Sequence, residues 1–462
     1  MSPGPLRHIP SLSELLENPK VKILADRLRP GDVVATVRVV LEELRAEFHA
    51  ATSEKTLPSV SELAERISRR VLEQRPPRPT RAINATGILL HPELGTPPWP
   101  DGAIRALDEA VSGYSSRGSG ASAGANDVES NRVVQQLRAL TRADDALVFC
   151  EAGAATIMVL EALGAQREII VSRGQVIQRG SRYRLPGLAA AASVGLREIG
   201  AANHVGLDDY RDAIGGKTAA ILVVHRHDAK TADHRNDIPV EDLARLAREH
   251  QLPLVHDLGP ATIVDLESLG VQFAPRVSNS IAAGADLVIF SHELLGGPPC
   301  GIVVGRNSLI KHIEQHAAAH AAFLGQPLVG SFAATLDEMD SPDRARANVP
   351  LVQLLTASAD NLKNRAARLA PQMAAADAIG RAEVVEAPGY LLGAPHPLGE
   401  MPGWAIALRP SGMAVEQLAK TLRDGNPAVF GYRLDDRLLL NLRAVSPQFD
   451  LELVERVEEF GT

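Results

Sequence analysis

The chain has few cysteines and lacks long apolar runs. Cys150 and Cys300 are the only two cysteines in 462 residues, and they lie on separate segments without metal-ligand spacing. This pattern argues against a disulfide framework and against a structural zinc site. No run of about 18 uncharged apolar residues occurs, and residues 1–7 lack the apolar core of a secretion signal. We therefore expect a cytoplasmic protein that binds no metal and does not enter a membrane.

The composition supports a large buried core. Hydrophobic residues make up 45% of the chain, and its length allows two or three domains. The net charge is −8, but residues 1–80 are slightly basic. That local excess is too small to establish nucleic-acid binding, although it makes this part the better candidate surface for a polyanion.

Residues 1–80 are predicted to form a small helical domain. Ser11-Leu-Ser-Glu14 is a capping-box pattern, and a longer helix is expected after Asp32. Its apolar residues recur on one face, at Val33, Val37, Val40 and Leu44. A third helix is expected from Ser59 or Ser61, and the prolines that follow end the domain near residue 80.

Residues 81–340 alternate short apolar runs with helical patterns. Strands are predicted at 146–150, 168–172, 219–224, 253–256, 286–290 and 302–304, with helices at 154–163 and 240–250. This order indicates an α/β domain with a mostly parallel sheet, in which ligands bind at the carboxyl ends of strands. Residues 341–462 are predicted to form an α+β C-terminal domain, with a long helix from about 345, strands at 404–408 and 437–442, and a helix at 415–422.

One segment has the layout of a cofactor-binding loop. The strand at 286–290 leads into Ser291, and Gly296-Gly297 precede the next strand. In pyridoxal-phosphate (PLP) enzymes of this kind, a lysine between these points forms an aldimine with the cofactor. Glu293 stands at that position here.

Other requirements of PLP have candidate residues. Asp257 ends a predicted strand and is placed to bind a pyridinium nitrogen, although a loop-capping role fits equally well. The turn Ala152-Gly153-Ala154-Ala155 begins a predicted helix, so its N–H groups are candidates for a phosphate, or its small residues serve close packing.

Two further strand ends and one helix carry polar side chains of interest. Arg173 and His225 follow strands on the expected ligand side and are candidates for contact with the cofactor or a substrate anion. Three histidines share one helix face, at His312, His316 and His320. Without a nearby carboxylate or cysteine, we interpret them as surface residues, not as metal ligands.

Several motifs together resemble the bacterial L-seryl-tRNA(Sec) selenium transferase family over nearly the whole chain. The segments that carry the resemblance are Ile83-Asn-Ala-Thr-Gly-Ile-Leu-Leu-His-Pro-Glu-Leu-Gly95, Ile170-Val-Ser-Arg-Gly174, Tyr183-Arg-Leu-Pro186, His256-Asp-Leu-Gly259, Val264-Asp-Leu266, Leu294-Leu-Gly-Gly297, Ala405-Ile-Ala-Leu-Arg-Pro410 and Leu440-Asn-Leu-Arg443.

The resemblance implies a fold type I PLP-dependent transferase that converts seryl-tRNA(Sec), with selenophosphate, to selenocysteinyl-tRNA(Sec). It further implies PLP as cofactor, tRNA(Sec) engaged by the helical front domain, and a homo-oligomer with active sites between subunits.

The sequence departs from the family pattern where the reaction takes place. The loop around Glu293 is one residue shorter than the family's and lacks the lysine, and the turn at 151–155 lacks the family's asparagines. An acidic, arginine-containing stretch is replaced at 116–124, and no Lys or Arg occurs between Lys311 and Arg344. A carboxylate cannot form an aldimine, which excludes covalent PLP catalysis through residue 293.

Three functions follow as hypotheses. In the first, the chain keeps the family fold and tRNA or partner binding, with the reaction lost or altered. In the second, it is an active transferase or lyase that uses another amine such as Lys230, or noncovalent PLP. In the third, it is a structural partner of an active homologue.

Overall fold

The computed structural model describes residues 9–27, 30–50, 58–73, 81–114, 128–179, 183–226, 238–393 and 398–459. Contacts divide the chain into two compact units, Met1–Thr80 and Arg81–Thr462. Among the described residues, no helix is long and apolar enough to cross a membrane.

The first unit is helical. Its helices are α1 (Leu12–Glu17), α2 (Pro19–Arg27), α3 (Pro30–Ala50) and α4 (Val60–Glu73). The apolar face predicted for α3 is confirmed at Val33, Val37, Val40 and Leu44, which are buried in one cluster with residues of α1 and α4. The capping pattern at Ser11 is also confirmed, since its hydroxyl accepts the Glu14 N–H at 3.2 Å. The short helix α2 was not predicted.

The start of α4 is set by Ser59, not by Ser61. The Ser59 hydroxyl accepts the Glu62 N–H at 3.2 Å, and the Glu62 carboxylate accepts the Ser59 N–H at 2.7 Å, which completes a capping box. Ser59→Ala is expected to destabilise the first unit by about 1 kcal/mol, measured by helical circular dichroism during urea unfolding. Ser61→Ala, in the same helical turn and exposed, is the control. Equal losses in both variants would contradict the assignment of the cap.

A seven-stranded sheet forms the centre of the second unit. Its order is β3 (Asp145–Phe149), β11 (Gly301–Gly305), β10 (Leu287–Ser291), β9 (Leu254–Pro260), β8 (Thr218–Val224), β4 (Glu168–Ser172) and β7 (Gly195–Ile199). Only β11 runs antiparallel to its neighbours. The predicted, mostly parallel sheet is confirmed, although the edge strand β7 was not predicted.

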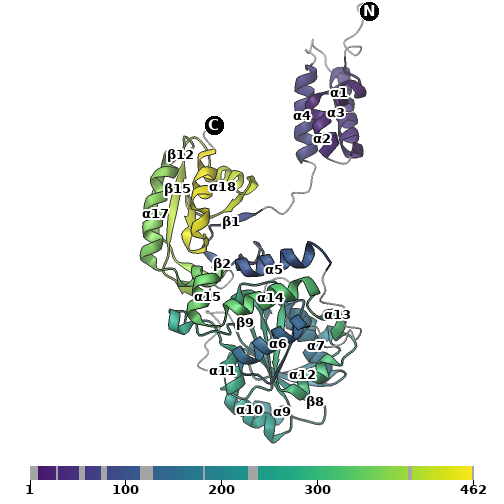
Figure 1. Ribbon diagram of the computed structural model, residues 1–462, viewed down its shortest axis with the longest axis vertical. Helices are drawn as coiled ribbons and strands as arrows, with labels where there is room; N and C mark the ends of the chain where they lie inside the picture. The colour runs from purple at the N-terminus through teal and green to yellow at the C-terminus, as the bar shows by residue number, and fades with distance from the viewer. Residues whose placement is uncertain are drawn as a thin grey trace, which may run out of the picture. The chain divides into compact units, whose positions relative to one another are not determined.

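Helices cover both faces of this sheet (Figure 1). Alternate residues of β10 point to opposite faces. On one face, Ile289 packs in a cluster with α7 (Ala152–Gly164), α8 (Leu185–Ala191) and α12 (Asn307–Glu314). On the other face, Phe290 packs in a cluster with α6 (Val128–Thr141), α11 (Val277–Ala282) and α14 (Gln326–Glu338). The helices α9 (Leu207–Ala213) and α10 (Val240–Glu249) cover the second face near β8. Burial on both faces explains why the strands are continuous apolar runs.

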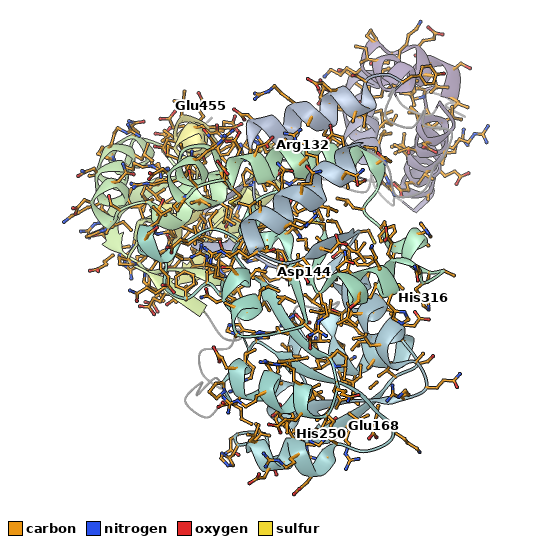
Figure 2. The ribbon with its side chains drawn as sticks, turned by 60° about the horizontal axis from the view of Figure 1, so that its bottom comes forward. Arg132, Asp144, Glu168, His250, His316 and Glu455 are labelled. Atoms are coloured by element: carbon orange, nitrogen blue, oxygen red, sulfur yellow. The ribbon has the colours of Figure 1, made fainter. Side chains whose placement is uncertain are left out.

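The parallel strands bring their ends to common edges. Glu168, the first residue of β4, and His250, which lies just before β9, are both at the lower end of the view in Figure 2. This is the amino edge of the sheet. The predicted site residues at the ends of β8, β9 and β10 therefore share the opposite, carboxyl edge.

The C-terminal part contains a four-stranded sheet of β12 (Ile379–Glu386), β15 (Trp404–Pro410), β18 (Arg437–Asn441) and β17 (Tyr432–Leu434), packed against α17 (Ala359–Ala374), α18 (Val415–Asp424) and α19 (Asp450–Glu458). The single long helix expected from about 345 is wrong. Three helices take its place, α15 (Pro342–Asn348), α16 (Pro350–Thr356) and α17, because Pro350 begins a new helix and the Ser358 hydroxyl caps another.

Two short early strands join this C-terminal part. β1 (Ala82–Asn84) pairs in parallel with β16 (Ala428–Phe430), and Figure 1 shows β1 beside the C-terminal elements. β2 (Ile88–Leu90) pairs with β13 (Gly389–Leu392), which also pairs with β14 (Leu398–Met401). These pairings explain why residues 81–90 and the C-terminal part belong to one compact unit.

Candidate functional site

Asp257 lies at the carboxyl edge of the sheet, within β9, and its side chain is 2% exposed. Three donors surround its carboxylate. Arg179 Nη1 and the Gly259 N–H each donate to Oδ1 at 2.9 Å, and the Tyr183 hydroxyl donates to Oδ2. Both carboxylate oxygens are therefore engaged by the protein itself.

A short hairpin supplies two of these donors. β5 (Gln178–Arg179) and β6 (Tyr183–Arg184) pair antiparallel, with Arg179 opposite Tyr183. The Arg179 guanidinium lies 4.8 Å from the centre of the Tyr183 ring and also donates to the His225 carbonyl at 3.1 Å. The hairpin thus anchors one cation between an aromatic ring and a buried carboxylate.

Gly259 leaves the space that this cation needs. Its φ of +60° favours glycine, and a Cβ atom there would lie 2.7 Å from Arg179 Cζ. The side chain of Arg179 is 17% exposed. The glycine, the arginine and the aspartate consequently form one packed arrangement.

The charges of this cluster shift the pKa values of its members. Burial lowers the pKa of Arg179, but the charge of Asp257, with Tyr183 and Glu293, outweighs burial and leaves the pKa above its usual value. Burial, followed by the charge of Asp257, raises the pKa of the Tyr183 hydroxyl far above its usual value. Arg179 therefore stays charged and Tyr183 stays protonated across the physiological range.

Glu293 follows Ser291 in a 3-10 turn, η6 (His292–Leu295). Its carboxylate is near enough to Arg179 and Cys300 to shift their pKa values. The pKa of Cys300 is raised by burial and then by Glu293 and Glu151. Glu293 Oε2 is buried and has no hydrogen-bond partner among the described residues. The Glu293 carboxylate thus adds a smaller electrostatic contribution at Arg179 than Asp257 does.

The turn proposed for a phosphate begins α7. Ala152, Gly153, Ala154 and Ala155 form its first turn, after Glu151, which provides no side-chain cap. The backbone of Glu151 and Ala152 is crossed closely by Gly301, where a Cβ would lie 2.4 Å from the Glu151 carbonyl oxygen. The helix end could attract an anion, but the carboxylate of Glu151, the residue before the helix, opposes a phosphate.

The glycines after Glu293 serve packing. A Cβ at Gly296, whose φ is +69°, would lie 2.8 Å from Val349 Cγ1, and one at Gly297 would lie 2.6 Å from Thr335 Oγ1. Ser291 is buried between β9 and β11, opposite Pro260 and Gly301. These three residues therefore fix the loop against α14 and α16.

The remaining candidates lie in different places. His225 follows β8, and its N–H donates to the Asp257 carbonyl at 2.8 Å, so it belongs to the cluster through its backbone. Arg173 instead pairs with Glu198 of β7 at 3.5 Å, and its side chain is 56% exposed. The structure brings Asp257, Glu293 and His225 together and directs Arg173 toward the sheet edge.

The prediction that the three histidines share one helix is wrong, because α12 ends at Glu314 and His320 lies in α13 (Ala319–Ala322). Each of them contacts a protein group. His312 Nε2 is 2.9 Å from the Ala162 carbonyl oxygen, and His316, labelled in Figure 2, lies 3.8 Å from the Glu161 carboxylate. His320 packs edge-on against Phe323. No group of three metal-binding side chains occurs in the described part of the chain.

Lysines are scarce in the part that contains the large sheet. Residues 81–340 contain only Lys217, Lys230 and Lys311. Lys217 immediately precedes β8 at the amino edge, and Lys311 is exposed on α12. Lys230, the amine considered as a replacement, lies outside the described residues.

The fold and the position of this cluster define the class of protein. A sheet with one antiparallel strand, covered on both faces, with Asp257 and Glu293 at its carboxyl edge, is the fold type I architecture of PLP-dependent transferases. The solved D-glucosaminate-6-phosphate ammonia-lyase has a similar fold, with a TM-score of 0.58 and 18% identity, covering 83% of this chain and 97% of that one. The family model described as L-seryl-tRNA selenium transferase matches residues 82–446, and the chain belongs to this family.

Relatives match along most of their length. The L-seryl-tRNA(Sec) selenium transferase of Carboxydothermus hydrogenoformans is 31% identical, covering 95% of this chain and 94% of the relative. The corresponding protein of Solidesulfovibrio magneticus is 34% identical, covering 84% of each. The predicted family membership and fold class are confirmed.

The family and fold imply PLP as cofactor, but the residues at this site do not fit it. Glu293 stands where a lysine is required after β10, the Asp257 carboxylate is bound by Arg179 and Tyr183, and the acidic Glu151 immediately precedes α7. The arrangement of these residues therefore supports no catalytic step through the cofactor.

Sequence reasoning did not identify Arg179 and Tyr183 as site residues. In the sequence, Tyr183 stands out only as part of the family motif Tyr183-Arg-Leu-Pro186. The four-residue spacing of Arg179 and Tyr183 around Gly180-Ser181 is compatible with a hairpin and is the one local signal for it. Their partner Asp257 is more than 70 positions away in sequence, so the fold was needed to identify the contact.

Proposed function

We propose that this chain is a selenium transferase family member that has lost covalent PLP catalysis and retains binding of tRNA(Sec), as a homo-oligomer. One observation carries the proposal: a glutamate, Glu293, follows the strand β10 at the position where the PLP amine is required. Loss of a single essential amine removes the covalent step, whereas it leaves the scaffold and its surfaces in place.

The surroundings of Glu293 support this proposal. Asp257 pairs with Arg179 at 2.9 Å, and Glu293 adds a smaller favourable charge interaction with the same guanidinium. A carboxylate that had replaced lysine without such a neighbour would be a buried, uncompensated charge. The local charges thus allow Glu293 to occupy this position in a site that has no covalently bound cofactor.

PLP added to the purified protein is expected to produce no aldimine absorbance and no adduct after borohydride reduction. The reason is that the described lysines of the sheet-containing part lie at the amino edge or on the outside of α12. Mass spectrometry of peptides after reduction provides the measurement, and Lys230→Ala is the matched control. A phosphopyridoxyl label on Lys230 in the unmodified chain, absent in the variant, would contradict the proposal and support an active enzyme.

Binding of tRNA(Sec) is inferred from the relatives, whose names specify this tRNA and whose length is covered to 94% or more in several cases. The first unit is the proposed contact surface. Several of its basic residues are paired with acidic ones, such as Arg70 with Glu43 at 2.6 Å, while Arg38, Arg45 and Arg69 are exposed. These three arginines are available to phosphates.

Removal of residues 1–80 is expected to weaken tRNA(Sec) binding by roughly tenfold or more and to reduce its salt dependence. Filter binding over a series of salt concentrations measures both. A triple variant of Arg38, Arg45 and Arg69 to alanine is expected to reproduce part of the loss with the unit still folded. Unchanged affinity and salt slope after truncation would reject the first unit as the contact surface.

A further inference from the structure

The Arg179 guanidinium fills the space beside Asp257. It donates to the Asp257 carboxylate at 2.9 Å and to the His225 carbonyl at 3.1 Å, and it lies on Gly259, which has no side chain to displace it. The Tyr183 ring closes another side, 4.8 Å from the guanidinium carbon. A planar cation of the protein is therefore held on four sides at the one carboxylate that a pyridine ring would need.

The charge of this cation matters as much as its volume. A PLP ring is active as an electron sink when a carboxylate keeps its nitrogen protonated. A protonated ring nitrogen placed at Asp257 would lie next to Arg179, and like charges disfavour protonation. Glu293 adds a weaker favourable charge interaction that also keeps the guanidinium charged.

We propose that Arg179 takes the place of the cofactor ring at Asp257, so that this chain excludes PLP and its analogues even when no covalent link is required. Asp257 and Arg179 then form an ion pair within the protein, and Glu293 adds a weaker negative charge. The Tyr183 ring packs against the guanidinium. This goes beyond the missing amine, because the guanidinium blocks the ring position whether or not a lysine is present, and restoring a lysine at residue 293 would not by itself restore binding.

Pyridoxamine phosphate separates the blocked ring position from the missing lysine. It carries an amine in place of the aldehyde and forms no aldimine with any lysine, so its binding reports only the ring and phosphate sites. Isothermal titration of the unmodified chain is expected to detect no binding, which sets an upper limit on its affinity. Arg179→Ser opens the space and removes the charge, and its affinity is expected to exceed that limit by at least about tenfold. Adding Asp257→Asn to Arg179→Ser is expected to reverse this gain.

Tyr183→Phe is the matched control, since it removes a hydrogen bond to the same carboxylate while Arg179 stays in place, and it is expected not to bind the probe. Near-ultraviolet circular dichroism checks that each variant is folded, and Arg179→Gln replaces Arg179→Ser if the latter does not fold. Binding by the unmodified chain, or no gain in a folded Arg179 variant, would overturn the inference. A borohydride-stable PLP adduct would instead overturn the proposed loss of covalent catalysis, so the two failures are distinguishable.

Discussion

Replacement of Asp257 by alanine is expected to lower the free energy of unfolding by about 3–5 kcal/mol. The variant leaves the Arg179 guanidinium, whose side chain is 17% exposed, without its carboxylate and removes the acceptor of the Tyr183 hydroxyl. Glu293 remains near Arg179 and compensates part of the charge, which places the effect toward the lower end of this range. Urea unfolding followed by circular dichroism measures the loss.

Two variants identify the cause of that loss. Tyr183→Phe removes one hydrogen bond and is expected to cost about 1 kcal/mol. The double variant Arg179→Met with Asp257→Leu removes both charges of the pair and is expected to be more stable than Asp257→Ala, because the Arg179 guanidinium is not left without its carboxylate. If Asp257→Ala unfolds at the same urea concentration as Tyr183→Phe, loss of the Arg179–Asp257 ion pair does not account for the expected decrease in the free energy of unfolding.

Acidification from about pH 6.5 to pH 4 is expected to remove about 3 kcal/mol of stability through His256 alone. This histidine of β9 is 7% exposed, and burial lowers its pKa from 6.5 to about 4; Asp257 raises the pKa and Arg179 lowers it, both to a smaller extent. Between the two pKa values the unfolded chain binds a proton that the folded chain does not. Stability is therefore full above pH 6.5 and falls until the folded pKa is reached.

His256→Gln separates this contribution from that of the carboxylates. The variant keeps a polar side chain that does not titrate, so its urea midpoint should fall less steeply over the same pH range. Nuclear magnetic resonance titration of the His256 ring provides the folded pKa directly. A ring that titrates near pH 6.5 in the folded protein would remove the basis of the expected pH dependence.

Apolar runs made much of the sheet predictable from sequence. The strands predicted at 168–172 and 219–224 agree with β4 and β8 to within one residue, because fully buried parallel strands are continuous apolar segments. By contrast, β7 contains Arg197 and Glu198 and lies at the edge of the sheet. An edge strand tolerates charged residues, so its composition does not distinguish it from a loop.

The site was predictable only in part, for a related reason. Asp257 and Glu293 were identified because each follows an apolar run that is readable by itself. The role of Arg179 depends on a two-residue hairpin and on the vacant Cβ position of Gly259. The hairpin strands are too short to show a period, so only the Gly180-Ser181 spacing indicates them, and the glycine is also expected in an ordinary turn.

The pairing of β1 with β16 has a consequence for synthesis on the ribosome. Ala82 and Ile83 emerge early, yet their partners Ala428 and Val429 are translated only near the end of the chain. Contacts between such distant segments form slowly, and an unpaired strand is prone to aggregation while it waits. The helical unit at residues 1–80 can complete its folding first, whereas the segment that follows it must remain exposed until translation is almost finished, which makes it a natural client for chaperones.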